Sequence, residues 1–289
     1  MSHFRFLQRG WKESLSRLFG SARREILICS PYITHDGTQF VEQTISEKFQ
    51  KDGRCTVITN LTPTNVLQGA TDPHALQHLS DAVPNFALWH LPRLHAKIYI
   101  ADTRSAIVTS ANLTYGGVEG NYEYGVHVDD EEVVGQIRQD IIGYGELGAR
   151  LSNKELSGYV DVANAVKAAF QRQQRTITKS ARVEFERLLH KAENNLISLR
   201  LSGASRTQVF ERTVEYLLGR HGSMTTSEIH SKIAAIHPDL CDDSVDRVIN
   251  GRHFGKRWKH AVRTAQNHLK SADHIELVGD RWQLVNRAS

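Results

Sequence analysis

Residues 25–128 alternate short apolar, β-rich runs with stretches that repeat apolar residues at helical spacing. Runs bounded by Ser, Pro or Gly are typical of strands, whereas apolar residues three and four apart are typical of helices. Strands that alternate with helices pack as a sheet covered by helices. The first half of the chain is therefore predicted to be an α/β domain. Strands are expected at 25–29, 55–59, 86–90, 96–100, 106–109 and 122–128, with helices at 37–50 and 131–144.

The β signal disappears at about residue 151, and two helical stripes follow it. These helices could dock on the first domain or pair between subunits, and the pattern favours neither. Ser and Gly residues at 202–205 then break the helical pattern, which indicates a boundary. The expected domains are 1–150, a helical linker at 151–203, and 204–289. The stripes are Val160, Ala163, Val166 and Phe170, then Phe185, Leu188, Ala192, Leu196 and Leu199.

The last segment predicts three helices and a β-hairpin. A helix is expected at 207–218, and Thr225 and Glu228 form a capping box before a second helix. A third is expected at 256–271, and residues 275–285 have the alternation and short turn of a hairpin. This order predicts a small winged helix-turn-helix domain, with Trp258 and Trp282 in its core.

The residues best suited to chemistry lie at the ends of two neighbouring predicted strands. His95 and Lys97 are two apart at the start of one, and Ser110 and Asn112 are two apart at the end of the next. Residues i and i+2 of a strand face the same side. An imidazole, an ammonium and uncharged hydrogen-bond donors would thus surround one space, which suits holding and attacking a phosphate.

The spacing of His95, Lys97, Asp102, Ser110 and Asn112 resembles the HxKxxxxDxxxxxxGSxN signature of the phospholipase D superfamily. One departure is Thr109, which stands where the family has glycine and is expected to change the backbone approach only slightly. The resemblance covers residues 1–148. Further family-like segments are Ser30, Pro31 and Tyr32, then Asn112, Leu113 and Thr114, and then Asn121, Tyr122 and Glu123.

The resemblance implies a phospholipase D-like mixed sheet flanked by helices and a phosphodiester-cleaving site without metal or other cofactor. Such sites use two histidines, whereas this chain has one complete motif. His230 and Lys232 repeat the spacing only on the surface of a predicted helix. The site would therefore form across a homodimer, with His95 as nucleophile and the partner subunit's His95 as general acid and base. Lys97, Ser110 and Asn112 would stabilise phosphoryl charge, Glu123 would hold a histidine ring, and Asp102 would buttress the site.

Other histidines and the cysteines give weaker signals. His35 and Asp36 follow the first strand and are candidates to line the cleft. His74 and His78 could share a helix face as metal ligands do, but without an evident third ligand they are expected at the surface, as is His90 on its separate strand. Cys29 and Cys55 are expected to be buried as small hydrophobes.

Charge and hydropathy limit the kinds of partner that the protein is expected to bind. The net charge is only +4, yet residues 251–270 contain six Lys and Arg and no acid, a candidate footprint for a polyanion. No apolar run has the length of a membrane span, and the N-terminal residues lack a secretory pattern, so a cytoplasmic protein without membrane contact is expected. The candidate DNA contacts are Arg252, Lys256, Arg257, Lys259 and Arg263.

The combined features favour a homodimeric DNA endonuclease that serves restriction or defence. Two alternatives remain open: a phospholipid phosphodiesterase, and a catalytically silent regulator that binds nucleic acid.

Overall fold

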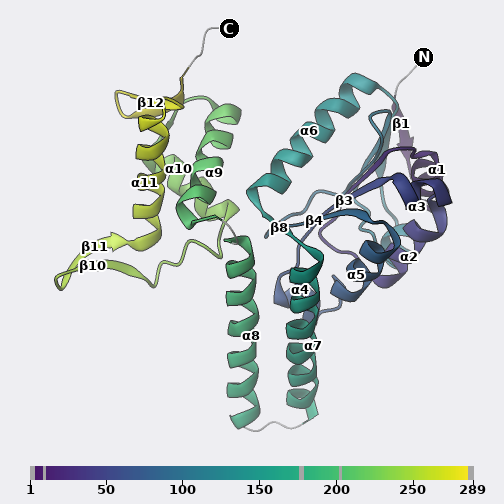
Figure 1. Ribbon diagram of the computed structural model, residues 1–289, viewed down its shortest axis with the longest axis horizontal. Coiled ribbons are helices and arrows are strands. Elements are labelled where there is room, and N and C mark those ends of the chain that lie inside the picture. Colours follow the sequence, from purple (N-terminus) through teal and green to yellow (C-terminus); the bar gives the residue numbers. More distant parts are fainter. Residues whose placement is uncertain (1–3, 9–10, 176–178, 202–203, 286–289) are drawn as a thin grey trace. The chain divides into compact units, whose positions relative to one another are not determined.

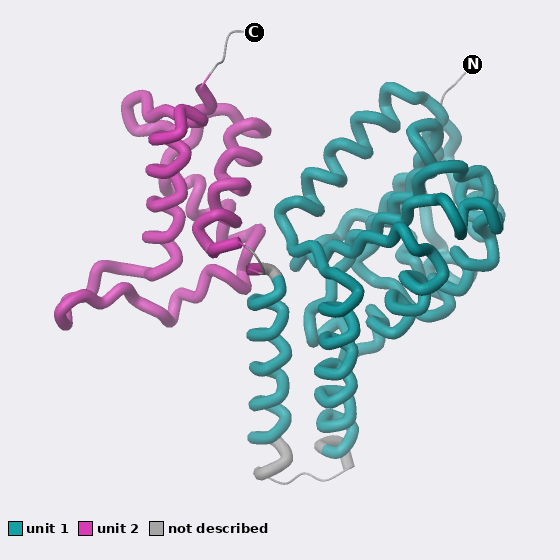
Figure 2. Tube along the Cα trace, in the orientation of Figure 1, with its two compact units in different colours: residues 1–199 teal, residues 200–289 magenta. Residues whose placement is uncertain are grey.

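The computed structural model describes residues 4–8, 11–175, 179–201 and 204–285. The chain divides into two compact units, Met1–Leu199 and Arg200–Ser289 (Figure 2). The expected break at 202–205 falls partly on residues 202 and 203, which lie outside the described residues. The helices expected to form a linker group with the first unit as far as Leu199.

Among the described residues, the first unit has one eight-stranded sheet in the order β1-β7-β6-β5-β2-β3-β4-β8 (Figure 1). β2, β3 and β4 are parallel neighbours, and all other neighbouring pairs are antiparallel. The predicted α/β class with a mixed sheet is confirmed. The strands are β1 (Phe4–Leu7), β2 (Glu25–Cys29), β3 (Arg54–Thr59), β4 (Asn85–His90), β5 (Ile98–Ala101), β6 (Ser105–Thr109), β7 (Gly125–Val128) and β8 (Ala149–Leu151).

Helices flank this sheet (Figure 1), and none of those described has the length and apolar run needed to cross a bilayer. They are α1 (Trp11–Ser21), α2 (His35–Thr44), α3 (Glu47–Asp52), α4 (Pro63–Leu67), α5 (Pro73–Ala82), the π-helix η1 (Gly116–Gly120), α6 (Glu131–Leu147), α7 (Asn153–Arg175) and α8 (Lys179–Arg200).

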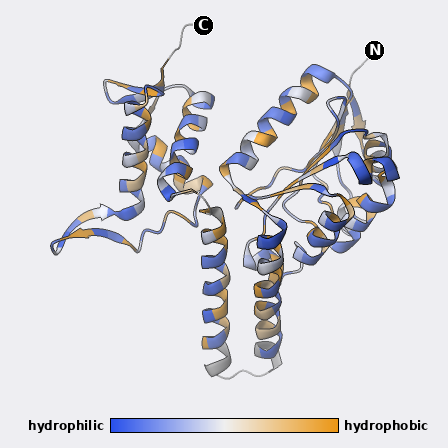
Figure 3. Ribbon diagram, viewed as in Figure 1, coloured by the Kyte–Doolittle hydropathy of each residue, from blue (hydrophilic) through white to orange (hydrophobic). Residues whose placement is uncertain are grey.

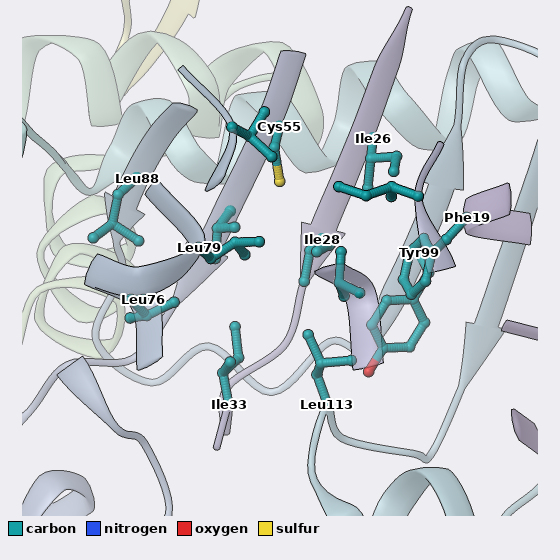
Figure 4. Close-up of a cluster of buried hydrophobic side chains, with 14 of the residues drawn as sticks. Phe19, Ile26, Ile28, Ile33, Cys55, Leu76, Leu79, Leu88, Tyr99 and Leu113 are labelled. Carbon is teal, nitrogen blue, oxygen red and sulfur yellow. The ribbon is translucent and has the colours of Figure 1, made fainter. Parts of the chain in front are cut away.

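The main core lies between the sheet and helices α1, α2, α3 and α5 (Figure 4). Phe19 from α1 packs edge-on against Tyr99 from β5, with ring centroids 6.0 Å apart. β2 lies in the middle of the sheet, and its residues from Ile26 to Cys29 are at most 1% exposed. A strand buried on both faces needs a continuous apolar run, which explains its sequence. Cys29 and Cys55 are buried, as predicted.

α7 continues this core because its apolar stripe packs on α4 and α5. Tyr159 is buried, and its hydroxyl donates a hydrogen bond to the Leu61 carbonyl at 2.5 Å. α8 adds Leu196 to the same core, and Phe185 on α8 lies 5.5 Å from Phe170 on α7 between ring centroids. Of the two possibilities left open by the sequence, docking on the first domain is therefore present within one chain.

Several boundaries differ from the predictions. The helix expected at 37–50 is split, because Ile45 is extended and Ser46 caps α3 by accepting a hydrogen bond from the Phe49 amide at 3.2 Å. β5 begins at Ile98 rather than residue 96, and β7 at Gly125 rather than residue 122. β1, α1, α4, α5, η1 and β8 have no counterpart among the predicted elements.

The second unit combines three helices with a small sheet of order β12-β13-β9. Trp258 and Trp282 are buried in its core, as predicted. The predicted capping box at Thr225 and Glu228 is also present. The elements are α9 (Arg206–His221), β9 (Met224–Thr225), α10 (Thr226–Ile236), β10 (Asp246–Ile249), β11 (Arg252–Lys256), α11 (Arg257–Ser271), β12 (Ile275–Val278) and β13 (Arg281–Leu284).

The β10–β11 hairpin was not predicted, although its signal is in the sequence. Asn250 and Gly251 form its two-residue turn, with φ of 50° and 76°. Positive φ at both positions is the reason that Asn-Gly is the strongest short-range hairpin signal. The turn joins Ile249 to Arg252, which are register partners.

His230 contradicts its predicted place on a helix surface, since it is 9% exposed. Its ring lies edge-on to Trp258, 5.5 Å between centroids, so the apolar side of α10 includes this imidazole. Burial, together with the nearby charges of Arg263, Lys259 and His260, lowers the pKa of His230 to about 4. The neutral ring is therefore the form that the fold accommodates.

This burial predicts acid sensitivity of the second unit. The pKa of His230 is lower in the folded state than in the unfolded state, so stability is complete above about pH 6.5 and falls as the pH approaches 4. At pH 5 the loss due to this group should be about 2 kcal/mol. Urea unfolding at pH 7 and pH 5 should show a smaller decline in His230→Leu than in the wild type. His221→Leu, at an exposed position, should decline like the wild type; equal declines in all three proteins would refute the assignment.

Candidate active site

Polar side chains from several loops meet at one edge of the large sheet. β2 and β6 end at this edge, while β5 and β7 begin there, because Cys29 pairs with Ile98, Ile98 with Val108, and Thr109 with Gly125. The segments that flank these strand ends carry five of the six predicted site residues. These are His95, Lys97, Ser110, Asn112 and Glu123.

His95 and Lys97 precede β5 rather than forming its start. The ladder nevertheless reaches Lys97, whose carbonyl accepts a hydrogen bond from the Thr109 amide at 3.0 Å. The His95 side chain is exposed, whereas Lys97 is only 7% exposed and its Nζ donates to the His95 carbonyl at 2.8 Å. The imidazole is thus open to a ligand, and a buried ammonium tethers the backbone that carries it.

The electrostatics of Lys97 suit anion binding. Burial lowers the pKa of its ammonium, and the nearby Glu123 carboxylate opposes this shift. A buried cation that is incompletely paired gains most from an anion placed beside it. Burial also raises the pKa of Cys29 to about 12, so its thiol is neutral and supplies no nucleophile.

Ser110 and Glu123 form a hydrogen-bonded pair. The Ser110 hydroxyl donates to Glu123 Oε2 at 2.5 Å and accepts from the Tyr124 amide at 3.1 Å. Asn121 Nδ2 donates to the other carboxylate oxygen of Glu123 at 3.1 Å. Within one chain, Glu123 therefore holds Ser110 rather than the histidine ring that was predicted, because its loop lies directly beside the end of β6.

Asn112 has an amide whose oxygen lacks a hydrogen-bond partner in the described structure. Its Oδ1 is buried, and no described group hydrogen-bonds to it. The backbone here is tightly enclosed: a Cβ on Gly117 would lie 2.1 Å from the Asn112 carbonyl oxygen. A buried polar atom without a partner is unfavourable unless something binds it.

The loop after β6 is clamped by the loop after β2. Ser30 Oγ accepts a hydrogen bond from the Leu113 amide at 3.1 Å, and the Thr34 amide donates to the Leu113 carbonyl at 3.1 Å. Tyr99 Oη donates to the Ala111 carbonyl at 2.9 Å from the core side. The family-like Ser30 segment thus positions the Ser110 and Asn112 loop.

Thr109, which departs from the family signature, fits the strand end. Its hydroxyl accepts a hydrogen bond from the Ala111 amide at 2.9 Å and donates to the Tyr124 carbonyl at 3.3 Å. The residue opposite it is Gly125, where a Cβ would meet the Val108 carbonyl oxygen at 2.4 Å. In this pair it is Gly125 on β7, rather than Thr109, that allows the two backbones to lie close together.

Asp102, the sixth predicted site residue, lies apart from this cluster. It follows β5 at the opposite edge of the sheet and has a φ of 53°. Its carboxylate accepts hydrogen bonds from the amides of Arg23, Arg24 and Glu25 at 3.0, 2.8 and 2.9 Å. Its role is to fix the start of β2 against the end of β5, in agreement with the predicted buttress.

The other histidines considered from the sequence differ in exposure. His35 and Asp36 are exposed in the first turn of α2, and His74 and His78 are exposed on α5. His90 is 1% exposed, against the surface expectation, and its Nδ1 accepts from the Leu61 amide at 3.0 Å. In the described part of the chain, no three His, Cys, Asp or Glu residues are grouped to hold a metal ion.

The predicted DNA contacts gather on the β10–β11 hairpin and α11. Arg252, Arg257 and Arg263 are exposed, whereas Lys256 is paired with Asp246 at 2.9 Å and Lys259 lies 5.4 Å from the Trp258 ring centroid. The first turn of α11 has no acidic residue. Cations there oppose the helix dipole, so they do not serve helix stability.

Residues 15–143 match the family model described as "Cardiolipin synthase, PLD-like domain". This range contains every residue of the cluster. No curated protein matches the chain.

Three solved structures that resemble the chain are NucT from Helicobacter pylori, the phospholipase D family member Nuc from Salmonella typhimurium, and phosphatidylserine synthase from Haemophilus influenzae. NucT is 16% identical, with a TM-score of 0.39, over 49% of this chain and 94% of NucT. Nuc is 14% identical, with a TM-score of 0.41, over 51% of this chain and 98% of Nuc. The synthase is 16% identical, with a TM-score of 0.45, over 62% of this chain and 46% of the synthase. Likenesses at this level say nothing about substrate.

Burial of Lys97 predicts a conflict between stability and anion binding. At pH 7, Lys97→Met should raise the free energy of unfolding by about 1 kcal/mol, because an incompletely paired buried charge is removed. The gain should shrink towards pH 10: the lowered pKa lets the folded wild type lose this proton before the unfolded chain does. Tungstate is a phosphate-like oxyanion. Thermal unfolding with and without tungstate should also show that the anion no longer stabilises the variant. Lys97→Arg, which keeps the positive charge, is the control. A Lys97→Met variant that is less stable than the wild type would contradict this account.

The hydrogen bonds of Asp102 predict a loss of stability without a loss of anion binding. Asp102→Ala should lower the free energy of unfolding by about 2–3 kcal/mol, because three amides lose a charged acceptor. Asp102→Asn should lose less, since asparagine keeps an acceptor and tolerates positive φ. Urea unfolding checks both, with the exposed Asp161→Ala as control. Tungstate binding per folded molecule should stay unchanged; a specific loss of that binding would return Asp102 to the site.

Proposed function

We propose that the chain is a phosphodiesterase, in keeping with the match of residues 15–143 to a PLD-like domain, and, more narrowly, a homodimeric DNA endonuclease that needs no metal ion. The observation that carries the proposal is the gathering of an exposed imidazole, a buried ammonium, a hydroxyl and an amide with an unpaired oxygen at one sheet edge. Cleavage of foreign DNA in restriction or defence is the biological role that fits.

The reaction would proceed through a phosphohistidine. An imidazole nitrogen of His95 bonds to phosphorus as the bond to the leaving oxygen breaks, and the partner subunit's His95 gives that oxygen a proton. Water then loses a proton to the same partner imidazole and attacks phosphorus. The phosphorus–nitrogen bond breaks, and His95 is regenerated.

The other residues would stabilise charge on the phosphoryl oxygens. Lys97 brings a cation that is already desolvated, so it interacts strongly without further loss of water. The Asn112 amide can rotate to present its NH2 group, because its oxygen has no partner to lose. Glu123 orients the Ser110 hydroxyl. Asp102 does not contact the substrate in this mechanism.

A second copy of the chain is supported by the surface around the site. Only one histidine belongs to the cluster among the described residues, so one chain lacks the acid for the leaving oxygen. Large side chains are exposed beside Ser110 and Glu123: Phe6 is 72% exposed, Tyr122 84%, and Tyr124 54%. Phe6 and Tyr124 stack with centroids 6.3 Å apart. Exposed aromatic groups of this kind are typical of protein interfaces.

DNA as the substrate is supported by the second unit. Arg252, Arg257 and Arg263 are exposed on adjoining elements, and arginine clusters of this kind supply phosphate contacts. The order of three helices followed by the β12–β13 hairpin agrees with a winged helix-turn-helix. We therefore assign DNA binding to this unit.

A phospholipid substrate is the second candidate, because the description of the matching family model names a phospholipid enzyme. That reading gives the second unit no part in substrate binding. A catalytically silent regulator would bind DNA without cutting it.

Plasmid cleavage in EDTA tests the proposed function. The full chain should cut supercoiled plasmid, His95→Ala should lose at least about 10³-fold in rate because the nucleophile is gone, and His74→Ala, an exposed histidine elsewhere, should cut normally. Light scattering on the same sample should give twice the mass of one chain.

Each alternative has its own outcome in this experiment. Cleavage that requires added metal refutes the proposed chemistry, and equal cutting by His95→Ala removes that residue from it. Hydrolysis of phosphatidylglycerol vesicles without plasmid cutting favours the lipid enzyme. Retention of plasmid with neither reaction favours the silent regulator.

A further inference from the structure

The second unit contains two hairpins that differ sharply in charge. Residues 245–263, which include β10–β11 and the first turns of α11, hold six Lys and Arg against one acid. Residues 273–284, which include β12–β13, hold three acids against one Arg. A polyanion would be attracted to the first hairpin and repelled by the second. The β12–β13 hairpin is nevertheless the one at the chain position expected for a wing.

Ion pairing does not remove this contrast. The one acid of the basic segment, Asp246, is bound by Lys256 at 2.9 Å and by His253 at 3.2 Å. The one cation of the acidic segment, Arg281, is bound to Glu228 at 3.1 Å. Arg252 near the turn of β10–β11 therefore remains as an exposed cation, while β12–β13 offers none.

The β10–β11 hairpin also exposes apolar side chains near its turn. Val248 is 52% exposed, Ile249 43%, and Phe254 50%. In the described structure β10 and β11 pair only with each other (Figure 1), and polar and apolar residues mix along them (Figure 3). An isolated two-stranded hairpin is marginally stable in water, so a surface that covers it would stabilise it.

The backbone gives the hairpin a defined shape. Positive φ at Asn250 and Gly251 forms the two-residue turn, and Gly255 has a φ of 89°. Gly255 lies at a register shift, where one extra residue separates the pairs Val248–His253 and Asp246–Lys256. A bulge of this kind twists and bends the strand. The ribbon enters α11 directly, since Lys256 is the N-cap of that helix.

We infer that the β10–β11 hairpin, not β12–β13, is the DNA-contacting ribbon of the second unit, and that it lies in the major groove of duplex DNA. The inference rests on the proposed function, which it makes more specific. The major groove admits a two-stranded ribbon. Arg252 contacts phosphate or a base edge, and Ile249 makes apolar contact beside it. Arg257 and Arg263 on α11 extend the contacts to the backbone.

Matched pairs of substitutions test this in full-length His95→Ala protein, which is expected to bind without cutting. Anisotropy of a labelled 30-base-pair duplex would be measured in EDTA over a range of salt concentrations. Arg252→Gln should weaken binding about 10-fold and reduce the log–log salt slope by about 1. Lys270→Gln, an exposed cation at the other end of α11, should change neither. Ile249→Ser should weaken binding about 5-fold with the slope unchanged, whereas Val278→Ser, 56% exposed on β12, should bind normally.

The outcomes separate this inference from the proposed function. If the parent protein fails to bind duplex DNA, the proposed function fails. If the parent binds and Arg252→Gln and Ile249→Ser bind equally well, or if Val278→Ser is the weaker variant, only the assignment of the hairpin is overturned. Thermal unfolding of each variant, expected to match the parent because the positions are exposed, separates lost contacts from lost folding.

Discussion

The antiparallel pairing of β5 between β2 and β6 is the constraint on which the candidate site depends. Because β5 runs against both neighbours, the residues before it meet the residues that follow β2 and β6 at one sheet edge. Hydrogen bonds from Leu113 to Ser30 and from Tyr99 to Ala111 then fix the loops. The chemistry requires groups distant in sequence, and the register of three strands supplies the proximity.

The sequence predicted much of this arrangement because strand periodicity and motif spacing are local properties. The β2 run is apolar at each buried position, so its bounds were predicted correctly. The loop partners could not be predicted in the same way. Within one chain Glu123 holds Ser110 because of where β7 begins, and His230 is buried because Trp258 packs on it. Both facts depend on tertiary contacts that no local pattern encodes.

The second unit shows the same division. Its three helices, the capping box and the β12–β13 hairpin follow from local signals. The β10–β11 hairpin also has a local signal in Asn250 and Gly251, whose positive φ values form its turn, and the helix predicted from Lys256 begins directly after it. The basic residues therefore belong to two elements, a ribbon and a helix, which together offer a longer surface than a helix alone.

The residues at the two ends of β5 have different roles, and both roles depend on the length of the strand. Lys97 serves the edge where the polar cluster lies, while Asp102 ties down the opposite edge through the amides at the start of β2. Side chains alternate between faces along a strand, so inserting or deleting one residue between them would turn one of the pair to the wrong side. The number of residues between the lysine and the aspartate of the motif therefore corresponds to the length of β5, from the end that carries the polar cluster to the opposite end.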